Sequence, residues 1–155
     1  FTAIEIPGHT RSHVAFHGRG LDGTGLLFCG DTLFSLGCGR MFEGDPEQFW
    51  ASLSRLAALP DEAVLYCAHE YTQSNIRFAL AVEPGNQRLI ARSKQVNALR
   101  QAGLPSVPST IETERETNPF LRAGESAVIA SARARGADDS PVAVFAALRE
   151  WKNRY

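Results

Sequence analysis

The sequence lacks the features of membrane proteins, nucleic-acid-binding proteins and disulfide-stabilised domains. No apolar run approaches the length of a membrane span, and the net charge of −1 provides no basic surface. We therefore expect neither a membrane nor a nucleic-acid partner. Only three cysteines are present, Cys29, Cys38 and Cys67, and they form no CxxC pair. Two of them lie in or beside expected strands, which favours reduced thiols and a cytoplasmic location.

The remaining composition is that of an ordinary globular chain. It has 155 residues, of which 44% are hydrophobic and 21% are charged. This length suits one domain, or one domain with a small appendage, and it is sufficient for a sizeable core. We expect the chain to act as a monomer.

Three short apolar stretches each end beside a side chain that can bind a metal ion. These side chains are His9 after residues 4–6, Asp31 after residues 26–29 and His69 after residues 64–68. Each stretch is typical of a short strand. We expect the three loops to meet at one edge of a sheet and to bind metal there, because a metal ion compensates a carboxylate at the end of a buried strand.

Each of these side chains also has an ordinary structural interpretation. His9 suits a turn, Asp31 suits a turn or helix cap, and His69 beside Glu70 is ambiguous. Their shared placement beside a glycine-rich apolar loop, residues 31–44, favours the metal site. Histidine and aspartate serve zinc, manganese and iron alike, and an aspartate can bridge two ions. Three side chains are nevertheless too few for a complete two-metal site.

The chain divides into a sheet-rich first half and a helical second half. Strands are expected at residues 2–6, 12–16, 26–29 and 63–67, and helices at residues 45–57, 72–82, 86–102 and 140–153. Asp45-Pro46 predicts the start of a helix that forms a parallel crossover. The prolines of residues 106–119 predict an extended connector. We place the boundary between residues 71 and 72.

Several motifs along the chain point to one family. Those around the expected ligands are PGHT at 7–10 with His13, LFCGDTLF at 27–34 with GCGR at 37–40, and YCAHEYT at 66–72. Those of the helical half are PSTI at 108–111, NPFLR at 118–122 and LREWKN at 148–153. Together they resemble the metal-site motifs and the glutathione-binding C-terminal domain of the hydroxyacylglutathione hydrolases (glyoxalase II), a branch of the metallo-β-lactamase superfamily. The resemblance covers nearly the whole chain.

The resemblance implies an enzyme that hydrolyses S-D-lactoylglutathione, and other 2-hydroxyacyl glutathione thioesters, in methylglyoxal detoxification. The products are D-lactate and glutathione. It also implies two divalent metal ions, zinc first and iron or manganese as alternatives. His9 would bind one ion, His69 the other, and Asp31 would bridge them as the catalytic residue. A metal-bound hydroxide would then attack the thioester carbonyl.

The resemblance also implies a binding site for the glutathione part of the substrate. Arg149 and Lys152 would bind its glycyl carboxylate, while Arg40 and Tyr71 would line the same pocket. The spacing of the two cations places them on one face of the last helix. Without the family, a solvated cationic helix end is the first interpretation of that pair. Phe42 stands where some family members have tyrosine.

One family motif, THxHxDH, has no counterpart in the chain. The sequence therefore resembles a C-terminal portion, an α/β (α+β) chain made of the second half of a metallo-β-lactamase αββα sandwich and a helical domain. We assign residues 1–71 to the partial metallo-β-lactamase-like domain and residues 72–155 to the glutathione-binding domain. One face of the sheet is then expected to be uncovered, and activity of this chain alone is open.

Three alternatives remain beside the thioesterase interpretation. The chain could be another metallo-β-lactamase-fold hydrolase or a glutathione persulfide dioxygenase. The dioxygenases lack a long helical tail, so residues 86–155 argue against them. The third alternative is a non-catalytic glutathione-binding fragment without a complete metal site.

Overall fold

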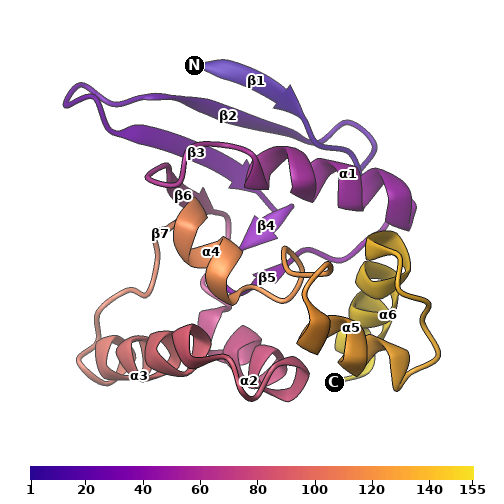
Figure 1. Cartoon of the computed structure of the whole chain (residues 1–155). Coiled ribbons are helices and arrows are strands. Elements are labelled where there is room, and N and C mark those ends of the chain that lie inside the picture. Colours follow the sequence, from indigo (N-terminus) through magenta and orange to yellow (C-terminus); the bar gives the residue numbers. More distant parts are fainter.

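A computed structural model describes residues 1–155, and its main sheet runs through the upper part of the molecule (Figure 1). The strands are β1 (Thr2–Glu5), β2 (Val14–Arg19), β3 (Gly25–Gly30), β6 (Val64–Cys67) and β7 (Ser109–Thr110). They pair in the order β1-β2-β3-β6-β7, and only β3 and β6 run parallel. The second strand begins at Val14, two residues later than expected, because the chain still turns at residues 11–12.

The parallel pair is connected by helix α1 (Pro46–Ala57), as the sequence predicts. The Asp45 carboxylate accepts a hydrogen bond from the backbone N–H of Gln48 at 2.8 Å, and Pro46 occupies the first turn. Such a cap satisfies one of the free N–H groups at the helix start. Phe49 and Leu53 of the apolar stripe are fully buried. The crossover therefore forms from local signals that agree with the packing.

The two faces of the sheet differ in their surroundings. Inward-facing residues are fully buried, namely Ala15, Leu27, Cys29 and Leu65. Their neighbours on the opposite face are exposed, namely Val14, Phe16, Phe28 and Tyr66. The rings of Phe28 and Tyr66 stack on that face at 5.2 Å. Within this chain, therefore, no other element covers these side chains on that face of the sheet.

The second half is mainly helical. Its helices are α2 (Thr72–Val82), α3 (Gln87–Gln101), α4 (Ile111–Thr117), α5 (Ser126–Arg133) and α6 (Pro141–Arg154). Helices α2 and α3 form the layer farthest from β1, while α6 lies beside the end of α1 and α5 lies next to α6 (Figure 1). Asn86 and Ser140 cap α3 and α6 through their side chains. None of the helices has the length and apolar character needed to cross a membrane.

The expectation of an extended connector over residues 106–119 is wrong. This segment contains both β7 and α4, which lie between its two prolines. The Thr110 hydroxyl accepts a hydrogen bond from the Thr113 N–H at 3.2 Å and so caps α4. Ile111 is fully buried in the main core. A threonine cap and one buried isoleucine suffice for this short helix because tertiary packing stabilises it.

The two halves share one apolar core. Its 21 buried residues come from both sides of residue 71. Phe145 of α6 packs edge-to-face against Phe49 of α1 at 5.6 Å and against Phe120 at 6.1 Å. The C-terminal half also adds β7 to the sheet. The division at residues 71 and 72 stays a prediction.

Candidate functional site

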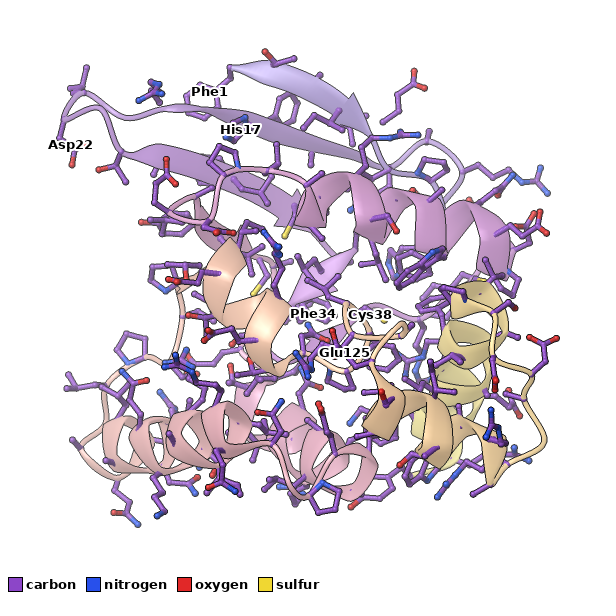
Figure 2. The ribbon with its side chains drawn as sticks, viewed as in Figure 1. Phe1, His17, Asp22, Phe34, Cys38 and Glu125 are labelled. Carbon is purple, nitrogen blue, oxygen red and sulfur yellow. The ribbon has the colours of Figure 1, made fainter.

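The loop that follows β3 forms a small hairpin in the middle of the molecule. Its strands are β4 (Leu33–Phe34) and β5 (Gly37–Cys38), which pair antiparallel. Figure 2 shows Phe34 and Cys38 where the sheet-rich and helical halves meet. Leu33, Phe34, Leu36 and Cys38 are buried there, which explains the apolar character of this part of the loop. We call residues 33–38 the central hairpin.

His9 is oriented by the chain that leaves the central hairpin. Its Nδ1 lies 2.8 Å from the carbonyl oxygen of Arg40. Because a carbonyl oxygen only accepts, Nδ1 carries the proton and Nε2 keeps a free lone pair. That Nε2 lies 4.0 Å from Oδ2 of Asp31. A histidine held in this way is typical of a metal ligand.

Asp31 lies between the two predicted histidine ligands. Its Oδ1 is 3.2 Å from Nε2 of His69, while its Oδ2 faces His9. The backbone N–H of Asp31 donates to Nε2 of His13 at 3.1 Å, so His13 supports the loop from behind. Gly30 makes this approach possible: its φ is +53°, and a Cβ there would lie 2.6 Å from His13 Nε2.

Aromatic side chains surround His69. Its ring stacks on Tyr71 at 4.9 Å, and Phe34 meets Tyr71 edge-to-face at 5.4 Å. The neighbouring Glu70 carboxylate accepts hydrogen bonds from the N–H and hydroxyl of Ser106, both at 2.7 Å. The end of β6 is therefore fixed on both sides, by ring packing and by a connection to the segment after α3.

The three side chains fit a metal ion in type and orientation. One oxygen of Asp31 faces each imidazole, which is the disposition of a carboxylate that bridges two ions. The set is small, however. No three histidine, cysteine, aspartate or glutamate side chains are close enough together to hold one ion by themselves. The three side chains by themselves therefore do not make a complete site for one ion.

All seven residues predicted for the site line one cavity of about 670 Å³. They are His9, Asp31, Arg40, His69, Tyr71, Arg149 and Lys152. The ligand-type side chains and the two cations of α6 thus face the same space, although they are far apart in the sequence. The volume falls within the usual range of small-molecule sites, roughly 300–1,000 Å³.

Arg149 and Lys152 give one part of the cavity lining an excess of positive charge, and we call this part the cationic end. Burial lowers the pKa of the Lys152 ammonium, and the nearby charges of Arg149 and Arg77 lower this pKa further. Neither Lys152 nor Arg149 forms a salt bridge, because the carboxylates that form such pairs bind other cations. The Nε of Arg149 is buried without a hydrogen-bond partner. This end of the cavity can therefore stabilise an anion.

Arg149 also has a structural role that the sequence does not indicate. Its Nη1 donates to the carbonyl oxygens of Cys38 at 2.9 Å and Gly39 at 3.2 Å. Nη1 also lies 3.5 Å from the Cys38 sulfur, and burial raises the pKa of that thiol. Only 5% of Arg149 is exposed. The solvated helix end considered from the sequence therefore does not describe this residue.

Several cavity residues were missed in the sequence. They are Phe34, Cys38, Gly39, Phe42, Ser74, Asn75, Asn153 and Tyr155. Ser74 and Asn75 carry no local signal, because a polar residue on a helix is usually solvated. Asn153 lies in the LREWKN motif, one position after Lys152, and Phe34, Cys38 and Gly39 lie in the LFCGDTLF and GCGR motifs, so these motifs were the available indication.

Two family models divide the chain between them. The model described as "Metallo-beta-lactamase superfamily" matches residues 1–69, and the model described as "Hydroxyacylglutathione hydrolase C-terminus" matches residues 70–155. Similar curated proteins carry the name hydroxyacylglutathione hydrolase. The protein of Cupriavidus metallidurans is 55% identical over 100% of this chain, and that of Dechloromonas aromatica is 50% identical over 99%. The chain spans 59% and 62% of their lengths, respectively.

Two solved structures are similar in fold. ETHE1 from Myxococcus xanthus matches 97% of this chain and 44% of its own, with 23% identity and a TM-score of 0.54. A metallo-β-lactamase from Staphylococcus aureus matches 97% of this chain and 38% of its own, with 19% identity and a TM-score of 0.50. At these identities the likeness concerns the fold. It agrees with the expected arrangement of part of an αββα sandwich followed by helices.

Proposed function

The chain belongs to the hydroxyacylglutathione hydrolase family, and from this membership we propose that its cavity serves the hydrolysis of S-D-lactoylglutathione to D-lactate and glutathione. The observation that carries the proposal is that two features lie in the same cavity. An aspartate flanked by two histidines lies at one end, and a cationic end made by Arg149 and Lys152 belongs to the same space. The substrate carries a thioester and a distant carboxylate, so its hydrolysis needs a group that acts on the thioester and a cationic group that binds the carboxylate.

We further propose that the site takes two divalent metal ions, with zinc first and iron or manganese as alternatives. His9 and His69 would each hold one ion, and Asp31 would bridge them. The ions would supply Lewis acidity, which polarises the thioester carbonyl and acidifies water. The contribution of the chain itself is orientation. The Arg40 carbonyl holds His9 in the tautomer with a free Nε2, and His13 fixes the Asp31 backbone.

The glutathione part of the substrate would occupy the cationic end. Its glycyl carboxylate would pair with the Lys152 ammonium and with the guanidinium of Arg149, two residues that line the cavity. Such charge-assisted hydrogen bonds are stronger than neutral ones and would orient the thioester toward Asp31. Arg40 and Tyr71 would contact the peptide between the two ends. Three free thiols support a cytoplasmic setting, where cysteines stay reduced.

A second candidate is glutathione binding without catalysis. It is favoured by one observation, that no three ligand-type side chains are close enough to hold an ion by themselves. The two candidates share the cationic end and differ at Asp31. Metal content and hydrolysis therefore separate them, whereas glutathione affinity does not.

The decisive experiment measures metal per chain, glutathione affinity by calorimetry and hydrolysis of S-D-lactoylglutathione on the same preparation. Asp31→Ala is expected to remove most of the bound metal and the hydrolysis, because both histidines lose the carboxylate between them. Asp61→Ala is the matched control, since Asp61 forms an exposed pair with Arg115 far from the cavity lining. It should change neither quantity.

Each outcome has a definite meaning. Metal and hydrolysis that both depend on Asp31 support the thioesterase. Glutathione affinity without metal or hydrolysis supports the binding candidate instead. A chain that binds neither glutathione nor metal would contradict both.

A further inference from the structure

The central hairpin is held by side chains from the helical half of the chain. Asn75 of α2 donates its Nδ2–H to the carbonyl of Ser35 at 3.0 Å. Asn118, which follows α4, donates to the carbonyls of Phe34 at 3.2 Å and Gly37 at 2.9 Å. The hairpin has only two residues in each strand, so few of its hydrogen bonds are its own. Its shape therefore depends on these outside donors.

The turn of the hairpin has a strained residue. Leu36 has a φ of +61°, a region that leucine rarely adopts. Its side chain is fully buried with Ile76 and Leu89 in a separate cluster between α2 and α3. The conformation costs on the order of 1 kcal/mol, so surrounding contacts must hold it.

Glu114 provides the contact at that strained turn. Its carboxylate accepts the Leu36 N–H at 2.7 Å, the Ser109 hydroxyl at 2.6 Å and the Asn118 side-chain N–H at 2.9 Å. Glu114 is fully buried. Burial raises the pKa of this carboxyl, and the three donors oppose that effect. One buried side chain thus binds both the turn and the asparagine that holds the two neighbouring carbonyls.

The hairpin is in direct contact with the proposed ligands. Phe34, Cys38 and the following Gly39 line the cavity. A Cβ added at Gly39 would lie 1.9 Å from the carbonyl oxygen of Asp31 and 3.1 Å from His9 Nδ1. With packing this close, a shift of the hairpin must move these two residues as well.

We propose that Glu114 is a positioning residue for the cavity, which acts by fixing the central hairpin and, through it, the placement of Asp31, His9 and the cavity wall. The inference rests on the proposed function, because it assigns Glu114 to that same site. Glu114 does not line the cavity, so it acts through the hairpin and does not touch substrate. Its role is distinct from general stability because it binds the turn at Leu36 directly and also binds Asn118, which holds the neighbouring carbonyls of the hairpin.

The test compares Glu114→Ala and the volume-conserving Glu114→Met with Glu114→Gln. A glutamine amide can keep its oxygen on Leu36 and Asn118 while its NH₂ donates to the Ser109 hydroxyl. Glu112→Ala is the control on the same helix, since Glu112 is exposed. Val128→Ala is the control for lost stability, since Val128 is fully buried on α5. The readouts on the full chain are the urea unfolding midpoint, amide hydrogen exchange and the Kd for glutathione.

We expect Glu114→Ala and Glu114→Met to speed amide exchange at residues 33–39 and to raise the Kd for glutathione, each by about tenfold or more. Glu114→Gln should stay within about threefold of the unchanged chain for both quantities. Val128→Ala should lower the unfolding midpoint without a selective effect on residues 33–39. Glu112→Ala should change nothing.

The proposal is overturned if Glu114→Met folds with unchanged exchange at the hairpin and unchanged Kd. It is also overturned if neither Glu114→Ala nor Glu114→Met folds, because Glu114 would then support the fold as a whole. If the unchanged chain binds no glutathione, the proposed function fails. Hydrogen exchange at residues 33–39 still decides the role of Glu114 in that case.

Discussion

Arg149 illustrates how one side chain can serve two neighbouring tasks. Its Nη1 is occupied by the carbonyls of Cys38 and Gly39, while the same residue also lines the cavity. A guanidinium can do both because its five donors point in fixed and different directions. The sequence predicts the binding role through the family motif. The contact with residues 38 and 39 is long-range, so no local pattern could have indicated it.

Lys152 should make glutathione affinity depend on pH. The pKa of its ammonium is lowered from 10.5 by burial and by Arg149 and Arg77, and the Cys38 sulfur opposes this effect. A bound carboxylate favours the charged ammonium and raises the pKa again. The affinity for glutathione should therefore be highest below the pKa that Lys152 has in the unbound protein. It should fall as pH rises through that pKa. The measurement is the Kd for glutathione across this range.

The control for that measurement is Lys152→Met, which keeps the stem and removes the charge. The thiol and amine of glutathione also titrate at alkaline pH, and they affect both chains equally. The difference between the two profiles therefore isolates Lys152. Parallel profiles would show that Lys152 does not pair with the ligand.

At the scale of elements, the sequence predicts those whose ends carry their own signals. Helices α1, α3 and α6 each begin with a side-chain cap at Asp45, Asn86 or Ser140. The central hairpin, β7 and α4 were not anticipated. Their stability comes from Glu114, Asn118 and burial against distant parts of the chain, and such contacts leave no periodic pattern in a short segment.

One buried ion pair contributes to the connection between α2 and the segment after α4. Arg122 donates to both oxygens of Glu83 at 2.8 and 2.9 Å, and little of either side chain is exposed. Arg122→Met should lower the free energy of unfolding by about 2–3 kcal/mol, because it leaves a buried carboxylate with weaker compensation. Urea unfolding measures this loss.

Arg133→Met is the matched comparison, since Arg133 pairs with Asp139 in an exposed position. Its effect should be below about 0.5 kcal/mol. Equal losses for the two variants would mean that Glu83 remains well solvated after Arg122 is removed.

For the whole molecule, the uncovered sheet face and the shared core lie on opposite sides of one sheet. Phe1, Phe16, Phe28 and Tyr66 present an exposed aromatic surface. Such surfaces are unusual on isolated domains. The sequence predicts this uncovered face, because the family comparison leaves part of the sandwich unaccounted for. The sequence does not predict that β7 and the contacts of Phe145 with Phe49 and Phe120 join the two halves into one core.

That shared core predicts that the chain unfolds as a single cooperative unit, without separate transitions for residues 1–71 and 72–155. Each half carries its own tryptophan. Trp50 on α1 packs near Phe145 at 6.2 Å, and Trp151 on α6 packs against Phe78 at 4.9 Å.

Single-tryptophan variants, Trp50→Phe and Trp151→Phe, therefore report on one half each. After correction for the stability of each variant, fluorescence and far-ultraviolet circular dichroism should give coincident urea transitions. If the Trp50 signal changed at a urea concentration where the Trp151 signal stayed native, the two halves would be separate folding units, and the contacts of Phe145 with Phe49 and Phe120 would be too weak to couple them.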